Sequence, residues 1–102
     1  MNLVALVGRL TRDPDLRYSQ SGIAVANFSI AVDRPFNRDE TDFFDIVAFR
    51  KTAEIASQHL TKGRQIGISG RLQQERWETQ DGEKRSKVVV VVDELTFIGS
   101  RS

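Results

Sequence analysis

Two large aromatic rings stand among charged residues, and these rings are the side chains best placed to do chemistry. Phe36 lies between Arg34 and Arg38, and Trp77 lies in the polar run 73–78. A ring without apolar neighbours along the chain has nothing local to bury it. Exposed rings stack on nucleic-acid bases without sequence preference, at about 1–3 kcal/mol per base. We therefore predict that both rings are stacking platforms, the alternative being that each folds back onto its own domain.

Two further rings, Phe43 and Phe49, share one face of a strand that is apolar on both faces. Such a strand is either central in a sheet or in contact with a ligand. Phe43 and Phe49 are therefore candidates for stacking, with a core position as the alternative. Cations that could follow a phosphate backbone surround these rings. They are Arg34, Arg38, Lys51, Lys62 and Arg76.

Catalytic and metal-binding residues are scarce. The chain has no cysteine and one histidine, His59, which excludes thiolate chemistry and a histidine metal cluster. His59 is expected on a helix as a partly buried or interface residue. Gly67 and Gly70 lie inside a predicted strand, where they suit a bend or a close backbone approach rather than a phosphate-binding loop. We predict no enzyme activity, no metal and no cofactor.

The composition is that of one small globular domain. The 102 residues are 39% hydrophobic and 28% charged, enough for a single core spanning residues 1–102. The formal net charge is only +1, so binding of a polyanion must depend on local patches. Eleven of the fifteen cations are arginine, which contacts phosphate and stacks on bases. The start has no leader pattern and no apolar run is long enough to span a membrane, which predicts a cytoplasmic, soluble protein.

Hydrophobic periodicity predicts five strands and one helix. The strands are expected at Leu3–Leu10, Ile23–Val32, Phe43–Arg50, Arg64–Trp77 and Lys84–Ile98, and the helix at Thr52–Thr61. A turn is expected at residues 11–15, a loop at residues 34–40, and a hairpin turn at Asp81-Gly82. A helix between the third and fourth strands is typical of the all-β, five-stranded oligonucleotide-binding (OB-fold) barrel.

Side-chain placement follows from these elements. Thr52 is expected to cap the helix, and Lys62-Gly63 suits its end. Phe28 and Phe97 are assigned to the core, and Phe44 to the core or to a subunit interface.

Three segments give the chain a resemblance, over essentially its whole length, to the core domain of bacterial single-stranded DNA-binding proteins. They are residues 2–18 (NLVALVGRL followed by DPDLRY), residues 22–28 (GIAVANF), and residues 43–63 (FFDIVAFRKTAE followed by LTKG). The resemblance implies a barrel that assembles as a homotetramer, often through its first strands. It also implies sequence-independent binding of single-stranded DNA in replication, recombination and repair, near the nucleoid.

The resemblance also implies site residues. Its stacking rings correspond to Phe36, Phe43, Phe49 and Trp77, and its phosphate contacts to Arg17, Lys51, Lys62 and Arg76.

Departures from the family pattern are present too. Many members carry tryptophan at the positions of Phe36 and Phe43, and cations at those of Gln73 and Glu75. Members recruit replication and repair proteins through an acidic tail that we do not find in this chain.

Two other functions remain open at the level of sequence. One is a primosomal replication protein of the same fold, against which the full set of rings argues. The other is a protein-interaction subunit, in which Phe36 and Trp77 would be interface anchors, because a fold does not fix a function.

Overall fold

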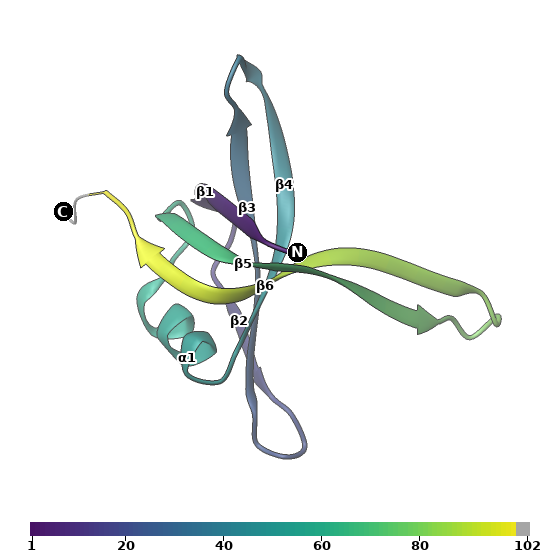
Figure 1. Ribbon diagram of the computed structural model, residues 1–102. Helices are drawn as coiled ribbons and strands as arrows, with labels where there is room; N and C mark the ends of the chain where they lie inside the picture. Colours follow the sequence, from purple (N-terminus) through teal and green to yellow (C-terminus); the bar gives the residue numbers. More distant parts are fainter. Residues whose placement is uncertain (100–102) are drawn as a thin grey trace.

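The computed structural model describes residues 1–99, and of Arg38 the backbone only. Six strands and one helix follow one another along the chain (Figure 1). They are β1 Val4–Leu10, β2 Asp15–Tyr18, β3 Ala24–Arg34, β4 Asn37–Phe49, α1 Arg50–His59, β5 Gln65–Glu78 and β6 Lys84–Phe97.

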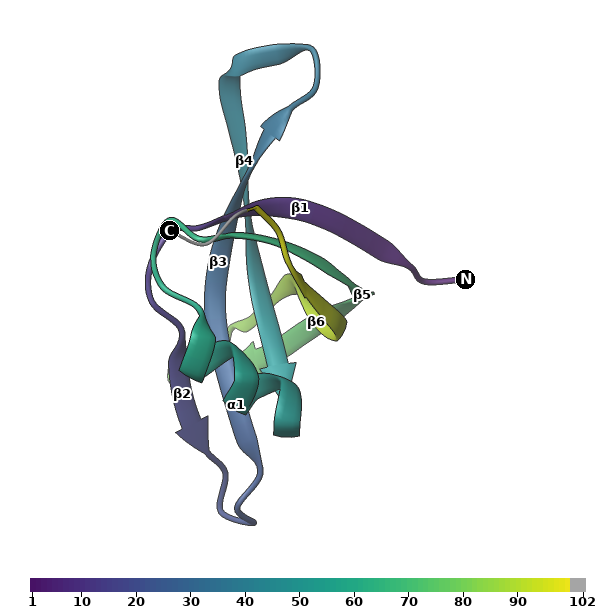
Figure 2. The same ribbon diagram turned by 90° about the vertical axis from the view of Figure 1, so that its left-hand side faces the viewer.

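The strands form a closed barrel. They lie in the order β1-β5-β6-β4-β3-β2, and a further pairing of β1 with β3 closes the sheet. The pairing of β4 with β6 is parallel, and the other pairings are antiparallel. Five strands close the barrel, with α1 between the third and fourth of them, which confirms the predicted OB-fold. Figure 2 shows α1 against the lower part of the barrel, beside β3.

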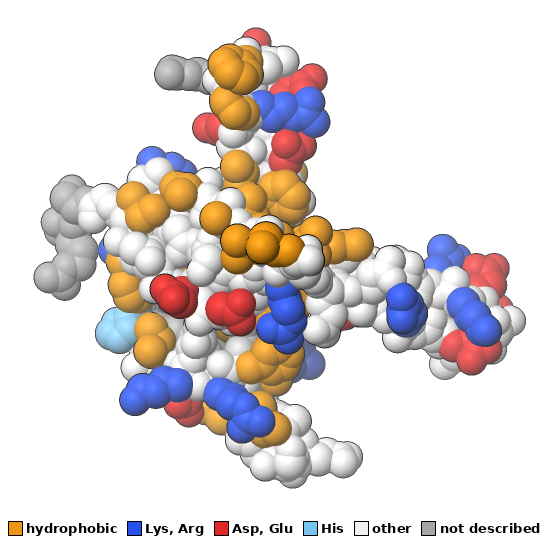
Figure 3. Space-filling model, in the orientation of Figure 1, with side chains coloured by type: hydrophobic (Ala, Val, Ile, Leu, Met, Phe, Trp, Pro, Cys, Tyr) orange, Lys and Arg blue, Asp and Glu red, His pale blue; other side chains and the backbone are white. Residues whose placement is uncertain are grey.

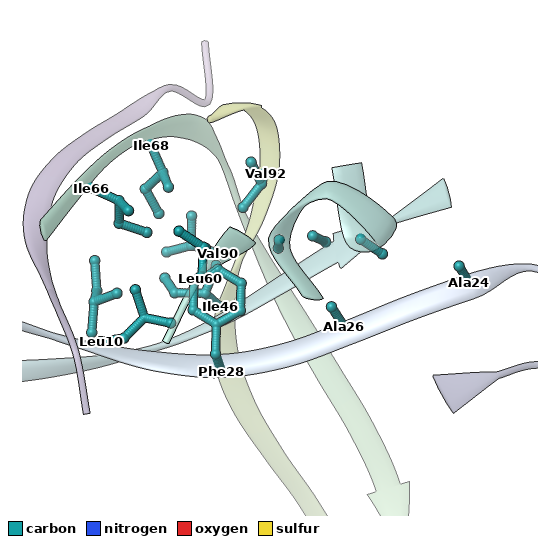
Figure 4. Packing of buried hydrophobic residues seen from close by; sticks show 14 residues of the cluster. Leu10, Ala24, Ala26, Phe28, Ile46, Leu60, Ile66, Ile68, Val90 and Val92 are labelled. Carbon is teal, nitrogen blue, oxygen red and sulfur yellow. The ribbon is translucent and has the colours of Figure 1, made fainter. Parts of the chain in front are cut away.

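The interior follows from the period-two pattern of the strands. The even-numbered residues Ala24, Ala26, Phe28 and Ile30 of β3 point inward and are buried. Figure 4 shows the Phe28 ring in the middle of the cluster, near Ile46, Leu60 and Val90, which confirms its core assignment. Full burial of a large apolar side chain stabilises a fold by about 1.5–3 kcal/mol.

Gly70 allows the barrel to close. A Cβ atom at Gly70 would lie 1.9 Å from the carbonyl oxygen of Val91, and the register of β5 and β6 shifts between Ser69 and Gly70. No side chain fits such an approach. The prediction that this glycine marks a close backbone contact is confirmed.

Two strand segments lie outside the predicted strands: residues 15–18, of which only Asp15 was expected in a turn, and most of the loop expected at residues 34–40. Residues 15–18 form β2, which pairs with residues 24–27 of β3 through a turn in which the Ser19 amide donates to the Ile23 carbonyl. Of the loop expected at residues 34–40, only Pro35 and Phe36 lie outside strands, because β3 and β4 continue past the barrel as a two-stranded arm. Cross-strand pairing decided both cases.

The helix also differs from its prediction. It begins at Arg50, directly after β4, with Phe49 at the N-cap and no side-chain capping bond, so the expected cap at Thr52 is wrong. Ala53 and Ala56 are its buried residues, and their small size allows α1 to approach the barrel.

Two other placements need correction. Phe97 is 41% exposed at the end of β6 rather than in the core. His59 is exposed, so the partly buried position is wrong and the interface position stays a prediction. Phe44 is partly buried against the core cluster.

Candidate nucleic-acid interface

One outer face of the sheet gathers most of the predicted stacking residues. Side chains alternate along β4, so Phe43, Val47 and Phe49 share the outer face while Ile46 and Ala48 fill the core. Phe43 is 67% exposed and Phe49 is 40% exposed. We call this surface the aromatic face.

A small apolar cluster supports the aromatic face. Val47 packs with Val89 and Val91 of β6, and the partly buried Val25 of β3 packs against them. The parallel pairing aligns Val47 with Val91, so these side chains bridge strands that are far apart in sequence. The cluster is separate from the barrel core and holds the strands beneath the rings in fixed positions.

Trp77 belongs to the same face, farther out on the β5–β6 arm. Residues directly opposite each other in an antiparallel pair share a face, and the register pairs Gln73 with Val89. Trp77 lies four residues beyond Gln73 on the same strand, so alternation places it on the same side. Its ring is 47% exposed. The structure therefore brings three of the four predicted rings onto one surface.

Phe36, the fourth ring, stands apart. It lies in the turn between β3 and β4, at the tip of the arm, and is fully exposed at 101%. Folding back onto the barrel, the alternative to a free ring, does not occur.

Arg17 lies on the aromatic face and is highly exposed. It pairs across the strands with Val25, which belongs to the supporting cluster. Its Nε donates to Asp15 at 3.2 Å, with the two side chains 77% and 51% exposed. Ion pairs this exposed contribute little to stability, so a phosphate can replace the carboxylate at small cost.

Arg34 is engaged by two carboxylates. Its Nε and Nη2 donate to the two Asp42 oxygens, each at 3.1 Å, and its Nη1 donates to Glu40 at 2.5 Å. The hydrogen bonds from Arg34 lower the pKa of Asp42, and the bonds to Asp42 raise the pKa of Arg34. Asp42 lies opposite Val32, whose side chain packs on the core, so this ion-pair group is on the side of the arm away from Phe43.

The other predicted cations are distributed more widely. Lys51 is exposed in the first turn of α1, and the backbone amide of exposed Lys62 donates to Asp13 at 2.8 Å. Arg76 is next to Trp77 in β5, so its side chain lies on the opposite side of the arm, where it donates a hydrogen bond to Gln74. Arg76 and Trp77 nevertheless line the same hollow near the tip of the arm. Arg38 lies in β4, and its side chain is outside the described structure.

Sequence reasoning missed two cations. Arg85 lies directly opposite Trp77 in the β5–β6 register, and Lys87 lies opposite Glu75, so both occupy the side of the arm that carries Trp77. Lys87 Nζ is 3.7 Å from Asp45 and 3.9 Å from Glu75. Pairing the strands outward from the Asp81-Gly82 turn would have found both positions.

The arrangement can hold an anionic polymer that carries flat aromatic groups. Exposed rings above a fixed apolar support offer faces for stacking, and arginines and lysines beside them attract phosphates. Among residues 1–99, no three histidine or acidic side chains gather as ligands for a metal ion.

A closed five-stranded barrel with exposed rings and cations along one face defines a binding domain of the oligonucleotide-binding class. Residues 1–98 match the model of the single-strand binding protein family, and the chain belongs to that family. This confirms the resemblance drawn from the sequence.

Three relatives illustrate the similarity. A single-stranded DNA-binding protein of Clostridium perfringens is 50% identical over 98% of this chain and 67% of its own length. A single-stranded DNA-binding protein of Oceanobacillus iheyensis is 46% identical over 99% of this chain and 65% of its own length. One of Fusobacterium nucleatum is 50% identical over 95% of this chain and 66% of its own length. The chain thus spans about two thirds of the length of these relatives.

Proposed function

We propose that this chain binds single-stranded DNA without sequence preference and protects it during replication, recombination and repair. The observation that carries the proposal is the aromatic face, on which Phe43 and Phe49 are exposed beside a buried valine cluster and Trp77 is exposed farther out on the same side. Relatives at 46–50% identity are named single-stranded DNA-binding proteins. The role proposed is binding rather than catalysis.

In this mechanism, bases stack on the rings and cations hold the backbone. Phe43, Phe49 and Trp77 take successive bases, and Phe36 takes a base at the tip of its arm. The cations assigned to phosphates are Arg17, Lys51, Lys62, Arg76 and Arg85, with Arg38 on the other arm, where Arg34 is held by Asp42 and Glu40. Only an unpaired strand offers its base faces to the rings, so the mechanism favours single strands over duplex.

The proposal includes a homo-oligomer, with a homotetramer as the expected state. Val4–Arg9 of β1 pair with β5 along one edge, whereas along the other edge only Arg9 and Leu10 pair with β3 in the described structure. An edge with free amide and carbonyl groups is suited to pairing with another chain. A second copy could add its own β1 there. Sedimentation of the purified chain over a range of concentrations tests this part, and a monomer throughout would remove it.

The proposed location is the cytoplasm, at the nucleoid. Among residues 1–99, the structure has no helix with the length and apolar character needed to cross a membrane. The location itself follows from the proposed ligand.

The experiment is an anisotropy titration of a labelled thirty-nucleotide oligo(dT) with the purified chain, at low and high salt. A labelled duplex of equal length is the control. We expect tight binding of the single strand that weakens with salt, since bound phosphates release counterions, and much weaker binding of the duplex. Equal binding of strand and duplex would contradict stacking as the basis of recognition. Binding of neither would favour the protein-interaction subunit.

A further inference from the structure

A second aromatic and cationic site lies at the far end of α1. A surface hollow of about 610 Å³ is lined by Gln58, His59, Arg64, Phe97 and Gly99. We call it the helix-end hollow. In Figure 3 it is found by the pale blue His59, which lies beside hydrophobic side chains at the edge of the molecule. Its volume lies within the range typical of small-ligand sites.

The hollow holds a built stack rather than scattered side chains. The Arg64 guanidinium carbon lies 5.4 Å from the centre of the Phe97 ring, within the range of cation–π attraction. The His59 ring meets the Phe97 ring edge to face, with centres 6.0 Å apart and planes at 81°. Phe97 is 41% exposed, which matches the 40% exposure of Phe49 on the aromatic face.

Arg64 has unused hydrogen-bonding capacity. Its Nε is buried and has no hydrogen-bond partner among residues 1–99. An unsatisfied buried donor costs about 1–3 kcal/mol, so its presence needs an explanation. A guanidinium held against a ring at the edge of a hollow suits a ligand that offers both a flat face and an anionic oxygen.

Helix α1 connects the hollow to the aromatic face. Phe49 is the N-cap of α1, and Gln58 and His59 are its last two residues. The ten residues of α1 span about 15 Å. A single strand at the spacing of stacked bases covers this distance with about five nucleotides. Arg50 and Lys51 are exposed at the start of this path.

We propose that the helix-end hollow is a further nucleotide subsite, in which a base stacks on the Arg64–Phe97 pair and an adjoining phosphate contacts Arg64. The inference rests on the proposed function, because the strand must first occupy the aromatic face. It predicts that a bound strand continues past Phe49, along α1, to the hollow.

The test compares strands of increasing length. Labelled oligo(dT) of four to thirty nucleotides is titrated with the parent chain and with Arg64→Gln, Arg64→Lys and Phe97→Leu. Arg9→Gln is the charge-matched control, because Arg9 lies outside the hollow and its Nη1 donates to the Gly63 carbonyl. Thermal melting of each variant checks the fold. If Phe97→Leu does not fold, the two Arg64 variants decide the question.

We expect the shortest strands to bind the parent, Arg64→Gln and Phe97→Leu equally. Strands long enough to reach the hollow should bind Arg64→Gln and Phe97→Leu about tenfold more weakly, which corresponds to the loss of one stacked base. Arg64→Lys should recover part of the loss, and Arg9→Gln should bind nearly as the parent does.

Two results would overturn the subsite. One is an equal loss at every length, which would mean that the residues act through the fold or the aromatic face. The other is no loss at any length. Failure of the parent chain to bind any strand would instead overturn the proposed function, so the two failures are distinguishable.

Discussion

The two arms that project from the barrel each carry a predicted stacking ring, yet they differ in charge. Residues 33–42 of the β3–β4 arm hold four carboxylates and two cations, whereas residues 75–87 of the β5–β6 arm hold four of each. Figure 3 shows the upper arm with blue side chains flanked by red, and the arm on the right with both colours dispersed. Two exposed rings therefore need not bind DNA equally well, because the charged side chains beside each ring attract or repel the phosphates.

The rings themselves also differ in support. Trp77 lies opposite Arg85 on the side of the sheet that carries the valine cluster, and it is half-buried. Phe36 is fully exposed at the tip of a turn, and the arginine beside it, Arg34, is held by Asp42 and Glu40. The comparison predicts that the β5–β6 arm contributes more to binding than the β3–β4 arm.

The largest expected effect is at the rings. Trp77→Ala should weaken oligo(dT) binding by about 30-fold, because it removes a stacked base from a supported position, whereas Phe36→Ala should cost about fivefold. Anisotropy titrations with both folded variants measure the difference. A larger loss from Phe36→Ala would break the comparison between the arms.

The next effect is at the arginines of the two arms. Arg85→Gln should weaken binding by roughly fivefold and reduce the slope of log affinity against log salt by about 0.7, the value for one phosphate contact on a single strand. Arg34→Gln is the matched variant and should change the slope little, since its guanidinium is held by two carboxylates, whereas Arg85 pairs only with Glu83, at 2.7 Å. Equal slope changes in the two variants would mean that DNA displaces the carboxylates freely.

A smaller effect is expected when Arg34 is released. Asp42→Asn should raise affinity about twofold at low salt, because an exposed ion pair of this kind is weak and the freed guanidinium becomes available to phosphate. Asp93→Asn is the control, since Asp93 pairs with Arg71 at 3.5 Å and its loss changes the net charge equally. An identical gain in both variants would show that only net charge matters.

The smallest effect concerns pH. Hydrogen bonding by Arg34 lowers the pKa of Asp42 below the ordinary value of an aspartate carboxyl. Stability from a carboxylate with a lowered folded-state pKa is present above the unfolded value and is lost as pH falls through the folded value. The arm should therefore keep its ion pair at neutral pH and lose it below about pH 4. An NMR titration of the Asp42 carboxyl carbon checks this, and a midpoint above the ordinary value of an aspartate carboxyl would contradict it.

The features predictable from the sequence were those set by near neighbours. Alternation along residues 24–30 placed Phe28 in the core, and the Asp81-Gly82 turn located the β5–β6 hairpin. The isolation of Phe36 and Trp77 among charged residues was enough to predict exposed rings. Each of these depends on residues close together in the chain.

The features that were missed depend on partners across strands. β2 exists because residues 15–18 find β3, and Arg34 meets Asp42 only when the arm pairs. Phe97 is a large apolar residue of the kind usually found in a core, yet it is the last residue of β6 and its side chain is partly exposed there. The periodicity of one strand does not reveal its pairing register with another strand. Arg85 was therefore not recognised as the cross-strand neighbour of Trp77.

The most direct test of the aromatic face uses the emission of Trp77, the only tryptophan in the chain. The purified protein is titrated with oligo(dT), with binding followed in parallel by the anisotropy of a labelled strand and with a duplex as control. We expect Trp77 emission to be quenched in step with binding of the single strand and to stay unchanged with the duplex. A strand that binds tightly while Trp77 emission is unaltered would contradict the claim that bases stack on this face.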